Sequence, residues 1–248
     1  MPALPAPPTL RARDPGRSVA QILWYALCRG ACHAAMTLVY RLRVWGRGNV
    51  PPTGPLLVVS NHQSFLDPLC VGSAVGPRHL HYVAKSGLFK GRATGALIRS
   101  VNAHPIRQDA PDTAAIRKAL ETLALGRALL VFPEGSRTLD GRMQPFKRGA
   151  WVLMSRARCP VLPVAVEGTY DAYRRGWKLP RVLGGPGVGV MIGRPIPADE
   201  LLALGPEAGL ERLAGAIDRM RCALHQRLGR AGTPLSTPPA PRPPEPAC

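Results

Sequence analysis

The stretch PLLVVSNHQSFLDP, residues 55–68, joins an unbroken apolar run to a polar loop and then to a proline. The run Leu56–Ser60 predicts a short buried strand. Pro68 disfavours α-helical geometry at Asp67 and suits the first position of a helix, so we expect a helix to begin at Pro68. The stretch therefore predicts a strand, a loop over residues 61–67 and a helix.

Other segments repeat this alternation of strand and helix patterns. Apolar runs and alternating residues predict strands, and apolar residues at helical spacing predict helices. The predicted strands are residues 40–46, Ala128–Phe132, Val161–Val166 and Val188–Ile192, and the predicted helices are Thr113–Leu125 and Pro206–Leu228. Because strands that alternate with helices are typical of an α/β fold, we expect a mixed, mostly parallel central sheet flanked by helices.

The chain has 248 residues, the length of one domain with appended ends. Residues 1–17 and 229–248 are rich in proline and lack apolar periodicity, which predicts two disordered tails. The folded domain is then expected over residues 41–228, preceded by an apolar segment at residues 18–40.

The segment at residues 18–40 is apolar but contains Arg29, Gly30 and His33. A membrane-spanning helix needs about 20 largely apolar residues with few charges. We therefore favour a membrane-associating segment, either one amphipathic helix or two short helices at the membrane interface. A packed core helix, a true span and a secretory signal are the alternatives.

The charge of the chain is strongly unbalanced. Lys and Arg number 33 against 15 Asp and Glu, a net charge of +18, which favours phosphate-bearing substrates, an acidic membrane surface or nucleic acid as partners. A GC-rich coding sequence explains arginine in place of lysine, but it does not explain the shortage of acidic residues. The basic residues are scattered and accompany no recognition helix, zinc finger or aromatic platform, so we do not expect nucleic acid. The six cysteines form no C-x-x-C pair, so we expect no metal site.

The polar loop holds a histidine and an aspartate that are suited to proton transfer. An imidazole can take a proton near neutral pH, and an adjacent carboxylate fixes its tautomer and stabilises its charged form. A turn through residues 63–66 would fold Asp67 back towards His62. Alternatively, Asp67 caps the helix while Asn61 and Ser64 serve the turn, and a carboxylate with two oxygens can do both. Ser64 is also a candidate nucleophile, which leaves a hydrolase open.

A second polar stretch follows another predicted strand. The sequence ALLVFPEGSRT, residues 128–138, ends a strand in a Pro-Glu-Gly turn with Arg137 just beyond it. The sequence PFKRGA, residues 145–150, adds Lys147 and Arg148. Such a cluster of fixed donors suits a phosphate group.

These blocks resemble a known family over residues 49–197, the lysophosphatidate acyltransferases, or 1-acylglycerol-3-phosphate acyltransferases, of the glycerolipid acyltransferase superfamily. NHQSFLD is similar to the family's N-H-x-S-x-x-D box. FPEGSRT is similar to its F-P-E-G-T-R-S block, with Ser136 in place of threonine and Thr138 in place of serine. VLPVAVEG resembles its fourth block, around Pro163.

The resemblance implies a role for each motif residue. It implies that His62 is the general base and that Asp67 orients it. The residues implied to bind the phosphate and glycerol of the acceptor are Glu134, Gly135, Ser136, Arg137 and, from a second motif whose usual spacing His104 and Pro105 interrupt, Arg107. The residues implied to support the site are Asn61, Ser64, Lys85, Lys147 and Pro163.

The resemblance also implies the reaction: transfer of a fatty acyl group from acyl-CoA or acyl-carrier protein to the sn-2 hydroxyl of 1-acyl-glycerol-3-phosphate, a lysophospholipid, giving phosphatidic acid in phospholipid biosynthesis. No cofactor is implied beyond this co-substrate. Because such donors are cytosolic, we expect the enzyme on the anionic cytoplasmic face of the cell membrane, peripheral or anchored through its N-terminal segment. Alternative acceptors are glycerol-3-phosphate and a lyso-ornithine lipid, and the alternative from another class is a non-catalytic basic protein that binds membrane or nucleic acid.

Overall fold

One mixed sheet organises the chain in the computed structural model, which describes residues 9–76, 78–89, 91–106, 112–182, 185 and 187–230. Within these residues the strands are β1 (Arg43–Trp45), β2 (Leu56–Ser60), β3 (Leu80–Lys85), β4 (Ala103–Ile106), β5 (Ala128–Val131), β6 (Val161–Glu167) and β7 (Gly189–Ile192). Their order is β1-β7-β6-β2-β5-β3-β4, and every neighbouring pair is parallel except β6–β7. The predicted mixed, mostly parallel sheet is confirmed.

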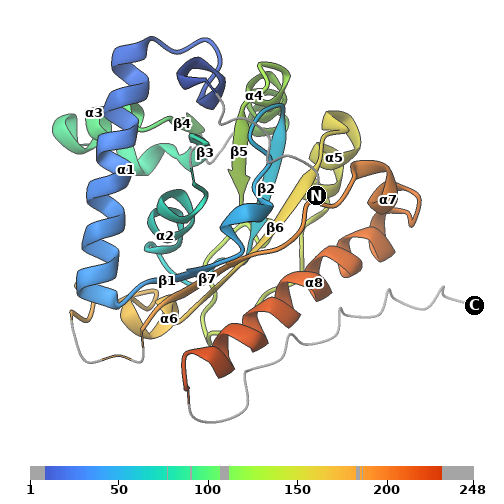
Figure 1. The fold of residues 1–248 in the computed structure, drawn as a ribbon. Helices are drawn as coiled ribbons and strands as arrows, with labels where there is room; N and C mark the ends of the chain where they lie inside the picture. The colour runs from blue at the N-terminus through green and yellow to red at the C-terminus, as the bar shows by residue number, and fades with distance from the viewer. Residues whose placement is uncertain are drawn as a thin grey trace, which may run out of the picture.

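Helices cover both faces of this sheet (Figure 1). One face carries α1 (Val19–Tyr40) and α2 (Asp67–Ala74), with α3 (Arg92–Ser100) beside α1. The other face carries α4 (Asp112–Ala124), α5 (Arg148–Ala157) and α8 (Pro206–Arg227). The short helices are α6 (Thr169–Ala172), α7 (Ala198–Leu202), η1 (Leu10–Arg13), η2 (Arg47–Asn49) and η3 (Ser86–Phe89).

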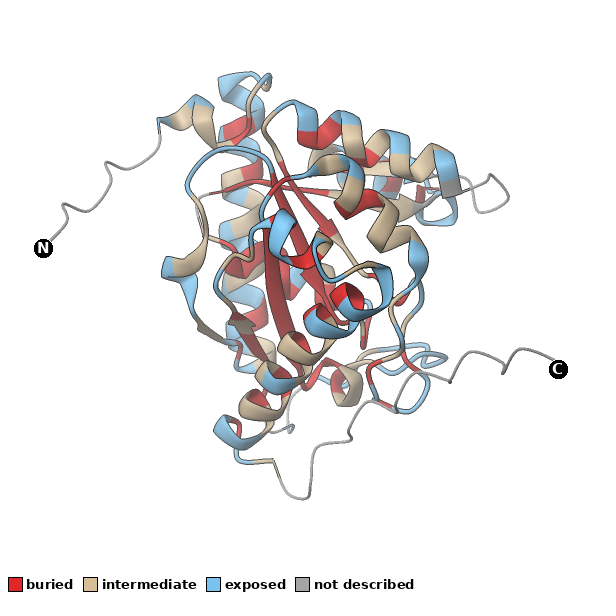
Figure 2. Ribbon diagram, turned by 90° about the vertical axis from the view of Figure 1, so that its right-hand side faces the viewer, coloured by how far each residue is buried: buried red, intermediate tan, exposed pale blue. Residues whose placement is uncertain are grey.

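The central strands are buried on both faces, as Figure 2 shows. Every residue of β2 and β6 is buried. Alternate side chains of a strand point to opposite faces, so Leu56 and Val58 join the core under α2 while Leu57 and Val59 join the core under α4, α5 and α8. Two covered faces explain why the run that opens the quoted stretch is apolar without alternation.

The sequence pattern predicted some elements and missed others. The predicted strands at β2, β5, β6 and β7 and the helices α4 and α8 are confirmed to within one or two residues, whereas the strand predicted at residues 40–46 is only three residues long because α1 continues to Tyr40. The strands β3 and β4 were missed because His81 and His104 interrupt their apolar runs. The position of β4 at the sheet edge also accommodates Pro105, which lacks an N–H group.

The apolar segment before the sheet is one continuous helix. Ser18 and Gln21 form a capping box at the start of α1. Only Ile22, Tyr25 and Met36 of its 22 residues are buried. Within the described residues, α1 is the helix that by length and composition could cross a membrane.

The predicted disordered tail at residues 1–17 is wrong for its second half. Asp14 is 1% exposed and accepts a hydrogen bond from His81 Nε2 at 3.0 Å, with His79 Nδ1 at 3.7 Å and Arg127 Nε at 3.2 Å. These contacts tie the start of α1 to the sheet. The sequence offered His79 and His81 no nearby acidic partner, because their partner lies more than 60 residues earlier in the chain. Residues 1–8 and 231–248 lie outside the described part of the structure.

The anchor extends to His104, whose Nε2 atom lies 3.0 Å from His81 Nδ1, and it predicts that acid destabilises the fold. Burial, and next the neighbouring His81, lower the pKa of His104 from 6.5 to about 4. Between these values the unfolded chain binds more protons than the folded chain, so this stabilisation is complete above pH 6.5 and is lost as the pH falls towards 4. We expect the urea midpoint of the native chain to fall over this range, and the fall to be smaller in His104→Gln. Parallel pH profiles for the two proteins would contradict this assignment.

Candidate active site

The loop between β2 and α2 brings the predicted histidine and aspartate together. His62 Nδ1 lies 2.8 Å from Asp67 Oδ2. Because a carboxylate only accepts, Nδ1 carries the proton of the neutral ring and Nε2 is left as the basic nitrogen. The Asp67 side chain is fully buried, while 16% of the His62 side chain is exposed. The pair therefore presents an oriented base that a substrate hydroxyl can reach.

The Asp67 carboxylate also fixes the loop that precedes it. Its Oδ2 atom accepts the backbone N–H groups of Gln63 at 2.6 Å and Ser64 at 2.7 Å, and its Oδ1 atom accepts the hydroxyl of Thr169 at 2.5 Å. The helix begins at Asp67 rather than at Pro68. The alternative in which Asp67 caps this helix is wrong, because the carboxylate turns back to residues before it instead of forward to the first turn of α2.

The FPEGSRT block holds the backbone of His62 on both sides. The N–H group of His62 donates to Glu134 Oε1 at 2.7 Å, and its carbonyl oxygen accepts the N–H group of Thr138 at 3.0 Å. The imidazole stacks on Phe132, with ring centroids 4.0 Å apart. Two motifs separated by about 70 residues therefore form one rigid site.

Glu134 lies beneath the site and connects two of its loops. Its second oxygen accepts the N–H group of Gln144 at 2.8 Å, and the residue is 3% exposed. Burial raises the pKa of Glu134 to about 8, and the N–H donors of Gln144 and His62 oppose this rise. Both carboxylate oxygens thus accept backbone N–H groups of the protein, and the predicted contact of Glu134 with the acceptor stays a prediction. Glu134 is a positioning residue in this geometry.

Cations gather at the outer side of the same turn. The guanidinium of Arg137 lies 3.4 Å from the ring centroid of Phe65. Burial, and next the charge of Arg175, lower the pKa of Arg137. Gly135 has a φ of +72°, and a Cβ there would lie 2.8 Å from Lys147 Nζ. Within the described residues, no salt bridge is formed by Arg137, Lys147 or Arg175. This edge suits an anion.

The side chains of Asn61 and Ser64 hydrogen-bond to the backbone of neighbouring elements rather than to His62. The Asn61 amide donates to Val166 O at 2.9 Å and accepts from Val166 N at 2.8 Å, which extends the pairing of β2 with β6. The Ser64 hydroxyl is buried and donates to Tyr173 O at 2.8 Å. It makes no hydrogen bond to His62 within the described residues, so Ser64 is not placed as a nucleophile.

The remaining predicted residues divide into two groups. Ser136 is exposed at the turn, and Pro163 is buried in β6 opposite Val59. Arg107 lies outside the described residues, and Lys85 is described only by its backbone at the end of β3. The predicted roles of Arg107 and Lys85 stay predictions.

Three contributors were not predicted from the sequence. Phe132 belongs to a quoted block, but nothing in that block indicates stacking on His62. Gln144 donates a backbone N–H group, which any residue except proline supplies. Thr169 follows β6 by two residues, and its place at the carboxyl end of a central strand is the one signal that could have found it.

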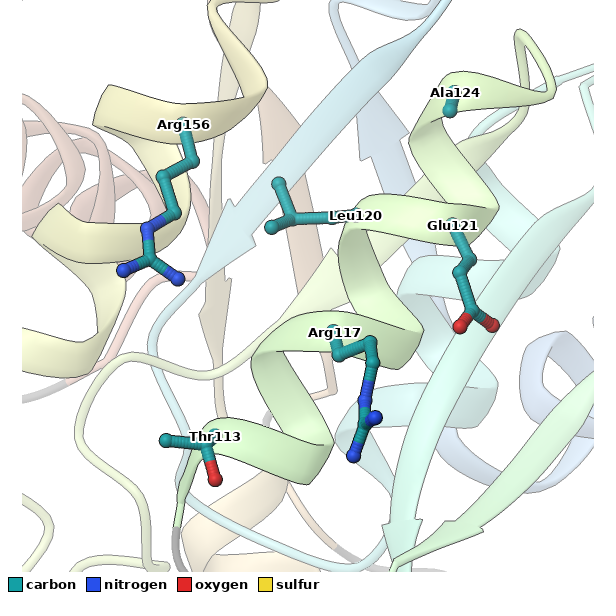
Figure 3. A pocket seen from close by; sticks show the side chains of 6 residues that line it. All are labelled: Thr113, Arg117, Leu120, Glu121, Ala124 and Arg156. Atoms are coloured by element: carbon teal, nitrogen blue, oxygen red, sulfur yellow. The ribbon is translucent and has the colours of Figure 1, made fainter.

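A surface groove of about 570 Å³ lies elsewhere, between α4 and α5 (Figure 3). Leu120 forms its apolar part, and Arg117 and Arg156 extend from the two helices. None of its lining residues contributes to the His62–Asp67 site, so it is separate from the chemistry described above.

Comparison with known proteins identifies the family. A family model described as "Acyltransferase" matches residues 41–167. The chain belongs to this acyltransferase family. The predicted resemblance to lysophosphatidate acyltransferases is thereby confirmed, and the matched segment contains His62, Asp67 and the FPEGSRT block.

Individual relatives agree with the family assignment. A 1-acyl-sn-glycerol-3-phosphate acyltransferase of Bacillus subtilis is 26% identical over 65% of this chain and 81% of its own length. The mouse protein 1-acyl-sn-glycerol-3-phosphate acyltransferase alpha is 32% identical over 58% of this chain and 51% of its own. The crystal structure of the 1-acyl-sn-glycerophosphate acyltransferase PlsC from Thermotoga maritima has a TM-score of 0.71 and 26% identity, covering 86% of this chain and 83% of that one.

The contacts of Glu134 predict that an amide in place of its carboxyl group fails. In Glu134→Gln, one backbone N–H group would face an NH₂ donor instead of an oxygen. We expect the acyl-transfer rate to fall about 100-fold, because a displacement of about 1 Å at His62 costs that much. The matched control is Glu121→Gln on α4, whose exposed carboxylate pairs with Lys118 in the part of the chain that the structure describes and should be dispensable. Wild-type turnover by Glu134→Gln would refute the positioning role.

Proposed function

We propose that this acyltransferase moves a fatty acyl group from an acyl thioester to the sn-2 hydroxyl of 1-acyl-glycerol-3-phosphate, giving phosphatidic acid. The observation that carries the proposal is the His62–Asp67 pair, whose free Nε2 lies in a site edged by cations without acidic partners among the described residues. The names of the relatives support this choice of acceptor.

The proposed mechanism needs no protein nucleophile. His62 Nε2 takes the proton from the acceptor hydroxyl as its oxygen forms a bond to the thioester carbonyl carbon. Asp67 stabilises the imidazolium through Nδ1–H. The tetrahedral intermediate then expels the thiolate, which takes the proton from His62 and leaves as a thiol. Base catalysis of this kind contributes about 10² to 10⁴ in rate.

The cationic edge is the proposed site of the acceptor phosphate. Arg137 is held by Phe65, so its planar donors are oriented before the substrate arrives. Lys147 lies over Gly135, whose lack of a side chain leaves it that space. The negative phosphate would relieve the repulsion between Arg137 and Arg175.

The donor and the location are further parts of the proposal. The donor is acyl-CoA or acyl-carrier protein, and no cofactor takes part. Apolar side chains of α1 that are exposed, among them Leu23, Leu27 and Leu38, suit insertion into a membrane, and the surplus of arginine suits its anionic cytoplasmic face. The proposal involves no nucleic acid.

Loss of the base should abolish the reaction. Thiol release from acyl-CoA or acyl-carrier protein is measured with and without lysophosphatidate. We expect release by the native chain to require the acceptor and to fall at least about 100-fold in His62→Ala. The control is His33→Ala on α1, a partly exposed histidine whose hydrogen bond, within the described residues, is to Arg47. Release without acceptor would indicate a hydrolase, and activity only with glycerol-3-phosphate or lyso-ornithine lipid would replace the acceptor named here.

Loss of the phosphate contact should change the KM values of the two substrates differently. In Arg137→Ala we expect KM for lysophosphatidate to rise about 10-fold or more while KM for the acyl donor changes little, because one charged hydrogen-bond donor is lost from ground-state binding. Arg212→Ala on α8, an exposed arginine beside Glu200, is the control. Equal changes in both KM values would argue against a phosphate site at Arg137.

A further inference from the structure

The two oxygens of the Asp67 carboxylate are held by different parts of the chain. Oδ2 receives His62 Nδ1–H and two backbone N–H groups of its own loop. Oδ1 receives the hydroxyl of Thr169, which is 102 residues away in sequence. Among the described residues, Thr169 is the only donor to Oδ1. Asp67 and Thr169 both have 0% exposure, so the Thr169 hydroxyl supplies the hydrogen bond that a buried water molecule would otherwise have to donate to Oδ1.

The other nearby amide cannot replace this donor. The Gln63 side chain donates through Nε2 to Glu167 Oε2 at 3.1 Å and lies 3.5 Å from Gly141 O. Its Oε1 atom faces the Thr169 hydroxyl at 3.2 Å, but that hydroxyl has a single proton. Asp67 is the closer acceptor, at 2.5 Å, and it is charged. The Thr169 hydroxyl therefore donates its hydrogen bond to the Asp67 carboxylate.

The local backbone places Thr169 with little freedom. Gly168 has a φ of +95°, and a Cβ there would meet Gly187 O at 2.4 Å, so the turn after β6 requires glycine. Thr169 begins α6, where its carbonyl accepts the N–H group of Tyr173 at 2.9 Å. One residue before the turn, Glu167 is held by Arg221 and His225 of α8. The hydroxyl is thus fixed by β6, α6 and α8 rather than by the loop that it supports.

We propose that Thr169 is a positioning residue of the acyl transfer, which donates its proton to Asp67 Oδ1 and so fixes the carboxylate that orients His62. The inference rests on the proposed function, because it assigns Thr169 to the same base. Thr169 itself exchanges no proton with substrate. Removing its hydroxyl leaves a buried carboxylate oxygen without a donor, which concentrates negative charge beside the imidazole and loosens the orientation of the ring.

The test compares Thr169→Val, which keeps the shape of the side chain, with Thr169→Ser, which keeps its donor. We expect kcat for lysophosphatidate-dependent thiol release to fall about 10- to 100-fold in Thr169→Val, the range that follows from leaving one buried charged acceptor unsatisfied, with both KM values nearly unchanged. Thr169→Ser should restore kcat to within about threefold. In Thr169→Val the acidic limb of the kcat profile should move to higher pH, because both Asp67 and His62 would hold protons more tightly.

Thr122→Val on α4 is the matched control, since Thr122 is also buried and its hydroxyl donates only to Lys118 O. Its kcat and its acidic limb should match those of the native chain. Should Thr169→Val fail to fold, Thr169→Cys replaces it, because a thiol of similar size is a poor donor and should show a partial loss. An unchanged kcat and acidic limb in Thr169→Val or Thr169→Cys, or a Thr169→Ser variant as impaired as Thr169→Val, would overturn the inference. Failure of the native chain to transfer acyl groups would instead overturn the proposed function.

Discussion

The buried carboxylate of Asp67 is the constraint on which the active site depends. An ionised carboxylate out of contact with water is costly unless donors surround it, and here an imidazole, two backbone N–H groups and a hydroxyl do so. To bring these donors to the carboxylate, the chain turns over residues 63–66, α2 begins at Asp67 and α6 begins at Thr169. The same hydrogen bonds leave one nitrogen of His62 free, so the demands of stability and of catalysis are met by one set of contacts.

The order of the strands explains why distant motifs meet. In the sheet, β2 lies between β5 and β6, and all three run parallel. Their carboxyl ends therefore share one edge, where the loop with His62 follows β2, Glu134 follows β5 and Thr169 follows β6. The central position of β2 also requires apolar side chains on both of its faces. The strand β2 thus packs in the core on both of its faces and also positions His62 at its carboxyl end.

The sequence was most informative where local chemistry decides the structure. The apolar runs of β2 and β6 predicted buried strands, and a turn that folds Asp67 back towards His62 was one of the two roles that the sequence left open for Asp67. The sequence offered no sign of partners that are remote or are backbone atoms. Asp14 shows no local indication of its pairing with His81, and nothing near Glu134 in the sequence indicates that its carboxylate accepts the N–H groups of two loops. In such cases the role of a residue depends on the order of the strands in the sheet, which no local sequence pattern specifies.

The position of the proton on the His62 ring shows directly whether Asp67 orients this residue as a base. Nitrogen-15 NMR of the six histidines reports which ring nitrogen carries the proton. The signals of His62 are assigned as those that disappear in His62→Gln. We expect a neutral ring protonated at Nδ1, hydrogen-bonded to Asp67, with Nε2 unprotonated. A ring protonated at Nε2, or one whose signals do not change in Asp67→Asn, would contradict the assignment of His62 as a base oriented by Asp67.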